Sequence, residues 1–359
     1  MSDYNKEIAE GFELLTQGEF EKSLEKFITA IEIDSTRPDA FSLASEAFAQ
    51  IGDIENAKSH AEQAYKMDSG KPEYVLQYAS MLYATGDSEE SLKLANEAQK
   101  KGEMPEIHLL KSNIYMDMEE AQKALKEAKI AFEMDKNPIY RTNYAIVLKE
   151  SGKIKESTEI LTKMIQEKPD DLDALYLLFQ NELAEEHLDE AMNYITKCIS
   201  LNDSEPLFYS ELASMMEDFE DNEKAEKYYK KALEVSDNDP EMAMQLAEFY
   251  QSMDKIQEGI DVLEGAHSDE DPEYFLMMGK LLLGKKEYNK ALSHLDIVIE
   301  MADDPEAKIV KGTCLMEINR LNDAQSILKE ALKQDFQTEY VESLLNQIWW
   351  KENSKKFKL

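Results

Sequence analysis

The residues that most often bind metal ions or act as nucleophiles are few in this sequence and lie far apart. No histidine or cysteine stands three or four positions from another, so no helical zinc pair is present. The sequence also lacks Gly-x-x-x-x-Gly-Lys, Gly-x-Gly-x-x-Gly and Gly-x-Ser-x-Gly motifs. The acidic segments 217–223 and 269–271 lack the alternating ligands and central glycine of a calcium loop. We therefore predict no catalytic residue, no metal site and no cofactor.

Charge is the strongest chemical feature of the chain. Its 359 residues include 75 Asp and Glu against 40 Lys and Arg, which gives a formal net charge of −35. Nucleic acids and anionic membrane surfaces are bound through clustered basic residues, so this balance argues against both as partners. Hydrophobic residues make up 43% of the chain, which is enough to build a core.

The cellular location is predicted from the absence of a signal peptide and of a membrane span. The first residues show no basic stretch followed by an apolar run, and no apolar segment approaches the roughly 18 residues of a membrane span. The two cysteines, Cys198 and Cys314, do not suggest a disulfide framework. We therefore expect two reduced, buried thiols in a cytoplasmic protein that does not insert into membranes.

The prolines reveal an internal repeat. All nine recur at intervals of 31 to 37 residues, at Pro38, Pro72, Pro105, Pro138, Pro169, Pro206, Pro240, Pro272 and Pro305. Proline is favoured in the first turn of a helix, where its missing N–H would have no partner. A proline in eight of ten repeats therefore predicts a recurring helix start, which we number position 1; Tyr4 and Leu172 take its place in the first and sixth repeats.

Small residues mark where two helices of each repeat approach each other. Position 20 is small in all ten repeats and position 8 in nine, with Phe179 as the exception. Glycine stands at position 15 in four repeats, as Gly18, Gly52, Gly86 and Gly152. This pattern predicts two helices of about 13 residues joined by a short turn. One such pair cannot cover its own apolar face, so consecutive pairs must stack.

These positions resemble the tetratricopeptide repeat family. The repeats within residues 4–338 match the family's 34-residue length. They also match its small residue at position 8, glycine at position 15, alanine at positions 20 and 27 and aromatic residue at position 24. The tryptophan that the family favours at position 4 is absent here; Glu7, His108, Arg141 and Lys308 are among its replacements. The resemblance implies an all-α, right-handed superhelical solenoid of ten repeats, at residues 4–37, 38–71, 72–104, 105–137, 138–171, 172–205, 206–239, 240–271, 272–304 and 305–338.

Three places depart from the regular pattern. In the sixth repeat, Phe179 takes a small position and Glu182 an apolar one, so we expect altered packing or curvature near residues 172–186. Residues 339–350 predict a capping helix, whose apolar stripe is Val341, Leu344, Leu345, Ile348 and Trp349. Residues 351–359 form a basic tail that is either solvated or docked on an acidic surface of this chain or a neighbouring copy.

The resemblance also implies a partner site on the concave face, at positions 2, 5, 9, 12 and 13 of each repeat. Fourteen of these fifty positions are acidic and only Lys149 and Lys280 are basic. Seven of the fourteen acids stand at position 2, where the helix dipole alone favours them. The remaining acids and several adaptable side chains are the groove candidates: Glu46, Tyr83, Met116, Asp117, Glu150, Tyr176, Glu217, Asp218, Met244, Glu248, Met316 and Glu317.

The negative charge of these groove positions indicates which kind of partner binds. The family's clamp for acidic chaperone tails needs a lysine at position 5, and no repeat has one. Carboxylates beside methionine and aromatic side chains suit a basic or amphipathic segment. We therefore predict a non-catalytic interaction scaffold that binds a protein or peptide of that kind. The alternative is a structural protein that forms homo-oligomers through its end helices or its basic tail.

Overall fold

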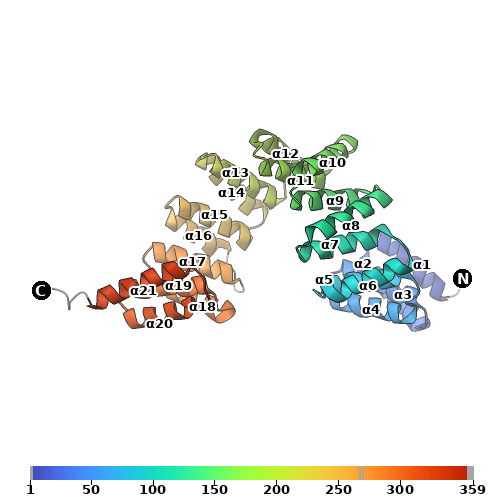
Figure 1. The fold of residues 1–359 in the computed structure, drawn as a ribbon, viewed down its shortest axis with the longest axis horizontal. Coiled ribbons are helices and arrows are strands. Elements are labelled where there is room, and N and C mark those ends of the chain that lie inside the picture. Colours follow the sequence, from blue (N-terminus) through green and yellow to red (C-terminus); the bar gives the residue numbers. More distant parts are fainter. Residues whose placement is uncertain (1–2, 267, 269–270, 354–359) are drawn as a thin grey trace. The chain divides into compact units, whose positions relative to one another are not determined.

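A computed structural model describes residues 3–266, 268 and 271–353 of the chain. Every regular element of these residues is an α-helix, so the predicted all-α class is confirmed. The chain divides into two compact units, Met1–Ala191 and Met192–Leu359. Within each unit the helices follow one another as antiparallel pairs (Figure 1).

The helices of the first unit are α1 (Asp3–Thr16), α2 (Phe20–Ile33), α3 (Pro38–Gln50), α4 (Ile54–Met67), α5 (Pro72–Ala84), α6 (Ser88–Lys101), α7 (Pro105–Asp117), α8 (Ala121–Met134), α9 (Pro138–Glu150), α10 (Ile154–Glu167) and α11 (Leu172–Ala184). Helix α12 (Leu188–Leu201) spans the boundary between the units. The second unit continues with α13 (Pro206–Asp218), α14 (Asn222–Val235), α15 (Pro240–Ser252), α16 (Ile256–Ala266), α17 (Pro272–Gly284), α18 (Tyr288–Ala302), α19 (Pro305–Glu317), α20 (Leu321–Leu332) and α21 (Thr338–Asn353).

The helix starts follow the proline pattern. Eight of the odd-numbered helices begin at a proline, whose fixed φ suits the first turn. All seven position-2 acids lie in the first turn of their helix, as expected from the helix dipole. Several helices are also capped by an acid just before the proline; the carboxylate of Asp304, for example, accepts from the amide of Ala307 at 2.6 Å. A part of the negative charge therefore stabilises helix ends.

The turn inside each repeat has one conformation throughout. Position 15 has a positive φ, between +57° and +83°, in all ten repeats, although only four of these residues are glycine. The amide of position 16 donates to the carbonyl of position 11 at 2.8–3.0 Å, and that of position 15 to position 12 at 2.8–3.2 Å. This pair of hydrogen bonds is the Schellman motif, which satisfies carbonyl groups that would have no partner at a helix end. The sequence signal at four glycines thus understates a turn that all ten repeats share.

Small residues do bring the two helices of a repeat together. A Cβ atom built on Gly11 would lie 2.6 Å from Cε1 of Phe27, and one built on Gly312 would lie 2.7 Å from Cδ2 of Leu328. Positions 8 and 20 also bond directly, as where Ser91 Oγ donates to the carbonyl oxygen of Ala79 at 2.7 Å. Large side chains at position 24 therefore fit only because position 8 is small.

Charged residues replace the family's tryptophan at position 4 and pair with groups nearby. The carboxylate of Glu7 lies 3.0 Å from Lys26 Nζ. Arg141 Nη1 lies 2.5 Å from a carboxylate oxygen of Glu167, and Lys308 Nζ lies 2.6 Å from one of Asp303. The pairs of Glu7 and Arg141 join the two helices of their repeats, whereas that of Lys308 joins α19 to the end of α18.

The sixth repeat accommodates its unusual residues by different packing. Phe179 is completely buried, and its ring stacks on that of Tyr176 with the centroids 5.7 Å apart. Asn181 is also fully buried and donates from Nδ2 to Ser157 Oγ at 2.9 Å, which ties α11 to α10. Glu182 accepts from Nδ1 of His187 at 2.8 Å instead of packing as an apolar residue.

The final helix covers the last repeat. Val341, Leu344 and Ile348 are buried in the cluster that includes residues of α19 and α20. Trp349, which the apolar stripe placed in this interface, is instead 46% exposed, because Ile348 already fills the contact one residue earlier. The helix runs to Asn353, three residues beyond the predicted end, so Lys351 belongs to it. Residues 354–359 of the basic tail lie outside the described residues.

Candidate partner-binding groove

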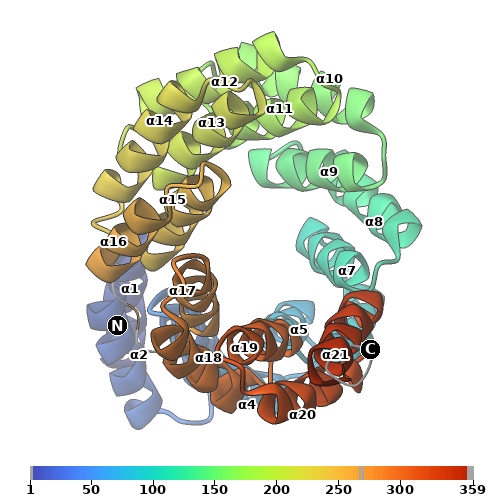
Figure 2. The same ribbon diagram turned by 90° about the vertical axis from the view of Figure 1, so that its left-hand side faces the viewer.

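The first helices of the repeats form the inner side of the curve within each unit. Figure 2 shows α15, α17 and α19 on the inside of the second unit, with α16, α18 and α20 outside them. Three hollows of the described surface are lined mainly by these inner helices. Of the twelve groove candidates, Glu217, Met244 and Glu248 line these hollows.

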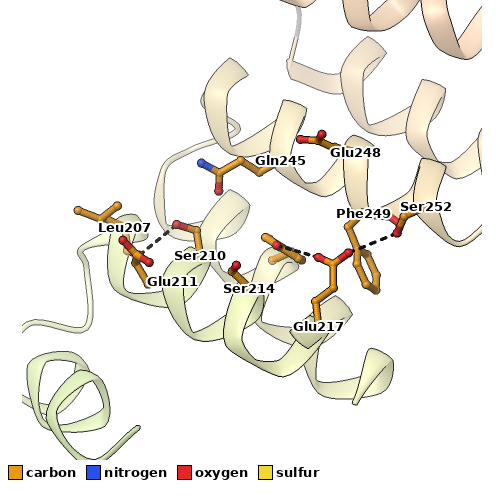
Figure 3. A pocket seen from close by; sticks show the side chains of 10 residues that line it. Leu207, Ser210, Glu211, Ser214, Glu217, Gln245, Glu248, Phe249 and Ser252 are labelled. Atoms are coloured by element: carbon orange, nitrogen blue, oxygen red, sulfur yellow. Dashed lines mark hydrogen bonds between the residues drawn. The ribbon is translucent and has the colours of Figure 1, made fainter. Parts of the chain in front are cut away.

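In the second unit, a hollow of about 530 Å³ lies between α13 and α15 (Figure 3). Three carboxylates line it, those of Glu211, Glu217 and Glu248, and the sequence had predicted the last two. Hydroxyl and amide groups fill out its polar lining, from Ser210, Ser214, Ser252 and Gln245. No lysine or arginine is among the described residues that line this hollow. Its chemistry is therefore that of an acceptor for cationic groups.

Glu217 is held in place by two hydroxyl groups. Tyr229, a buried residue of α14, donates its phenol to Oε2 at 3.1 Å. Ser252 of the next repeat donates to Oε1 at 3.4 Å (Figure 3). Burial, together with the charge of Glu217, raises the pKa of Tyr229, so the phenol stays protonated and remains a donor. This carboxylate is thus oriented before any partner arrives.

A second hollow, of about 410 Å³, lies along α15, α17 and α19 and shares Glu248 with the first. Glu241, Glu273 and Glu306 line it from the first turns of the three helices, and Asp304 lies just before α19. Met244, Leu276 and Met277 supply its apolar part. Its one lining cation, Lys280, lies 2.6 Å from a carboxylate oxygen of Glu306. Acidic and flexible apolar groups therefore alternate along the inner face of this unit.

The first unit presents a different lining. A hollow of about 590 Å³ on α7, α9 and α11 is lined by the apolar side chains of Leu109, Ile139 and Ile146. Ile139 is 55% exposed, and the Nδ2 atom of Asn143 donates to Oδ1 of Asn113 at 2.8 Å. The sequence does not indicate this hollow when groove positions are ranked by charge, because most of its lining side chains are uncharged.

The predicted groove residues of the first unit are spread over several helices. Glu46 is exposed on α3, where desolvation by neighbouring protein raises its pKa. Tyr83 donates to Asp117 at 2.7 Å across two repeats, and burial with this bond raises the pKa of Tyr83 to about 12. Glu150 is exposed and lies 3.3 Å from Lys149 Nζ. Met116 and Tyr176 are half-buried.

In the second unit, Met244, Glu217 and Glu248 line the two connected hollows. Asp218 and Glu317 are exposed at the carboxyl ends of α13 and α19, outside the lining of these hollows. Met316 is wrong as a groove residue: it is only 4% exposed and belongs to the same buried cluster as Val341 and Ile348 of α21. Its backbone carbonyl also lies 3.5 Å from Lys351 Nζ of the capping helix.

Sites for other chemistry are not evident in the described residues. No group of three or more histidine, cysteine, aspartate or glutamate side chains is arranged to hold a metal ion there. Cys198 and Cys314 are fully buried, and burial raises the pKa of each thiol to about 11. No helix in the described ranges is both long and apolar enough to cross a bilayer.

Three stretches of the chain match family models of the tetratricopeptide repeat, at residues 42–103, 208–239 and 282–348. Subunit 4 of the outer dynein arm-docking complex of Mus musculus is 31% identical over 91 residues. That match spans 25% of this chain and only 15% of the mouse protein's own length. The family matches fall in both compact units.

Yeast Tom70 and PilF are among the solved structures to which this chain is similar. Yeast Tom70 is 11% identical with a TM-score of 0.46, and the alignment covers 99% of this chain and 96% of Tom70. PilF of Pseudomonas aeruginosa is 18% identical with a TM-score of 0.49, covering 59% of this chain and 97% of PilF.

Proposed function

The chain belongs to the tetratricopeptide repeat family, and we propose that it is a non-catalytic scaffold that binds a basic or amphipathic protein segment along the inner face of its second unit. The observation that carries this proposal is the pair of connected hollows on α13, α15, α17 and α19. They are lined by seven carboxylates, and their one lining cation is already paired. We further propose that the protein works in the cytoplasm.

The recognition chemistry follows from the lining. Carboxylates such as those of Glu217 and Glu248 accept hydrogen bonds from lysine or arginine side chains, and charge-assisted bonds of this kind are stronger than neutral ones. Met244 and Met277 are flexible and polarizable, so they adapt to apolar side chains of various shapes. A segment that alternates basic and large apolar residues satisfies both requirements at once.

A peptide-binding experiment tests the charge of the partner. A labelled peptide that alternates lysine with leucine or phenylalanine is titrated by fluorescence anisotropy, beside the same peptide with glutamate in place of lysine. We expect the basic peptide to bind and the acidic one not to bind. Raising the ionic strength from about 50 mM to about 300 mM should weaken binding severalfold, because screening shortens the range of the groove's field.

A charge-reversal pair locates the site. Glu217→Lys with Glu248→Lys should weaken binding of the basic peptide by about tenfold or more. The matched control is Glu264→Lys with Glu300→Lys, which makes the same change in net charge at exposed positions of α16 and α18. Equal losses in both pairs would mean that net charge, and not the groove, governs binding. No loss in either pair would exclude the proposed face.

Self-association is a second candidate, and one contact favours it. Lys351 Nζ of the capping helix lies 3.5 Å from the carbonyl oxygen of Met316 on the inner helix α19. Lys355, Lys356 and Lys358 follow in the sequence, and their charge is opposite in sign to that of the acidic hollows. Light scattering on the full chain and on one ending at Asn353 tests this candidate. A monomeric mass for both chains over the whole concentration range would exclude it.

A further inference from the structure

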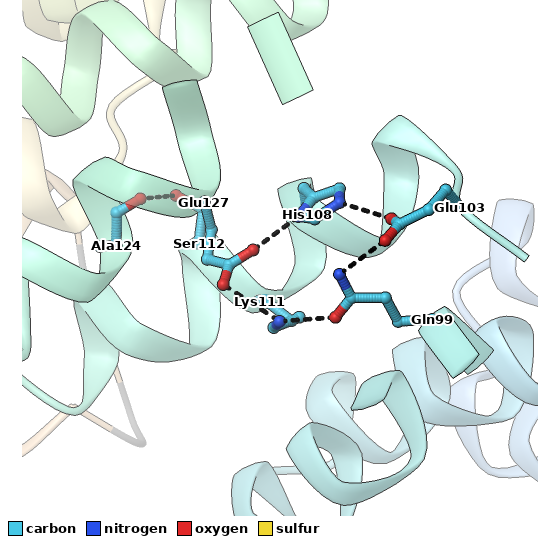
Figure 4. Close-up of polar contacts among 7 residues, drawn as sticks. All are labelled: Gln99, Glu103, His108, Lys111, Ser112, Ala124 and Glu127. Carbon is cyan, nitrogen blue, oxygen red and sulfur yellow. Dashed lines mark hydrogen bonds and ion pairs between the residues drawn. The ribbon is translucent and has the colours of Figure 1, made fainter. Parts of the chain in front are cut away.

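An ion cluster in the first unit is buried where the family usually places an aromatic ring. His108, on α7, is 2% exposed, and both of its ring nitrogens face carboxylates (Figure 4). Nδ1 lies 2.5 Å from Oε2 of Glu127 on α8, and Nε2 lies 2.9 Å from Oε2 of Glu103 in the segment between α6 and α7. The imidazole thus joins three consecutive parts of the chain.

Only the protonated ring satisfies this geometry. A neutral imidazole carries one N–H and one lone pair, so one of the two nitrogens would turn a lone pair toward a carboxylate oxygen. Imidazolium donates at both nitrogens and makes both contacts favourable. The ring position therefore requires a positive charge on His108 as long as Glu103 and Glu127 are ionised.

The remaining charged groups around the ring are few. Lys111 Nζ, also on α7, lies 3.0 Å from Oε1 of Glu127 and donates to Oε1 of Gln99 at 3.0 Å. Gln99 in turn donates to Glu103 at 3.0 Å. Two carboxylates therefore balance one ammonium and one imidazolium. Loss of the histidine proton leaves one uncompensated negative charge in a largely buried site, which is costly.

The pKa directions agree with this account. Hydrogen bonding to Glu127 is the largest influence and raises the pKa of His108, with Glu103 acting in the same sense against burial. Burial alone would raise the pKa of Glu127, but the hydrogen bonds from His108 and Lys111 together lower it. Hydrogen bonds from Gln99 and then His108 lower the pKa of Glu103.

Helix α7, which carries His108, also forms part of the wall of the apolar hollow in the first unit. Leu109 and Asn113 of α7 line the apolar hollow of the first unit, on the turn that contains His108 and the turn after it. We propose that His108 is a proton-dependent clamp that fixes α7 between α8 and the α6–α7 segment. Loss of its proton releases Glu103 and loosens this wall of the apolar hollow.

The direction of the pH effect follows from linkage. The folded-state pKa of His108 lies above its ordinary value of about 6.5, so the clamp's stabilisation is fully present below about pH 6.5. It is lost as the pH rises through the folded-state pKa. At the acid end, the lowered pKa of Glu127 means that its contribution is lost as the pH falls below about 4.5. The clamp is therefore complete in mildly acidic solution.

Histidine titration by NMR tests the charge of the ring directly. The His108 signal is assigned by its absence in His108→Gln, and its titration is compared with that of His294, whose pKa burial lowers. We expect His108 to titrate above about 6.5 and His294 below it. Glu103→Gln should shift the His108 titration to lower pH, because one of its two carboxylate partners is gone. A ring that titrates at or below the ordinary value would overturn the proposal.

Hydrogen exchange tests the clamp itself and does not depend on an identified ligand. Amide protection of α7, corrected for the intrinsic effect of pH, is compared at about pH 6 and pH 8.5. Deprotonation of His108 removes its charge-assisted hydrogen bond to Glu103, so we expect a severalfold loss of protection at the higher pH. Glu103→Gln should show a smaller pH dependence in α7, and α2 should show little in either protein. Equal corrected protection of α7 at both pH values would refute the clamp.

Discussion

Two glycines of α17 allow a sharp test of the packing between helices. A Cβ atom on Gly279, at position 8, would lie 2.8 Å from Cδ2 and 2.9 Å from Cγ of Leu295 on α18. A Cβ atom on Gly284, five residues later in the same helix, would meet only Ile256, at 3.5 Å or more. The first distance is far below ordinary van der Waals contact and the second is within it. Alanine should therefore have opposite effects at the two positions.

The magnitudes follow from competing terms. Alanine is favoured over glycine in a helix interior by about 1 kcal/mol. Overpacking a well-filled core costs about 1–3 kcal/mol. Gly279→Ala should thus lower the free energy of unfolding by up to about 2 kcal/mol in total. Gly284→Ala, at the last residue of α17, should raise it by about 0.5 kcal/mol.

A double-mutant cycle separates the clash from other causes. Leu295→Ala alone should cost about 2–5 kcal/mol, because it empties a fully buried site. Adding Gly279→Ala to Leu295→Ala should raise the free energy of unfolding by up to about 1 kcal/mol, since the atoms that would clash are gone and the helix preference for alanine remains. Protection of α17 and α18 in native-state hydrogen exchange is the suitable assay, because repeat arrays need not unfold in one step. Additive effects of the two changes, or equal stability of the two glycine variants, would refute this explanation of position 8.

Two further predictions concern a turn and an ion cluster. Glu119→Gly should raise the free energy of unfolding by about 0.5–1 kcal/mol, because a left-handed conformation strains a residue with a side chain; Gly86→Ala should lower it, and urea unfolding of both variants checks the sign. Hydrogen bonds from Lys230 and Lys255 lower the pKa of Glu226 to about 2. Its stabilisation should be present above about pH 4.5 and be lost as the pH falls from there toward 2. Glu226→Gln should therefore remove part of the acid-induced loss of stability between about pH 5 and pH 3, and an unchanged profile would contradict the assignment.

The repeat could be predicted from sequence because its signals are steric. A proline at a helix start and a small residue at a crossing are required by backbone geometry, so they recur wherever the fold recurs. The helices begin at those prolines in the structure. Even so, glycine marked only four of the ten turns, because residues such as Glu119 and Asn319 adopt the same positive φ at a modest energetic cost.

The ion clusters could not be predicted in the same way. The partners of His108 lie 5 and 19 residues away in the sequence, on different elements, and no spacing rule connects them. Glu217 and Glu248 were predicted because they stand at regular groove positions. Met316 stands at the same kind of position, but the cap that buries it belongs to the end of the array and not to the repeat pattern.

The shared turn of the repeats also makes this protein convenient to label. At position 15 the backbone is fixed, yet a Cβ atom on Gly18, Gly52, Gly86 or Gly152 would meet nothing within 4 Å. The residues there in other repeats, such as Glu119 and Glu220, are exposed. Because the two native thiols are fully buried, a cysteine placed at one of these residues would be the reactive one. A dye attached there would report on a bound segment without entering either the groove or the core.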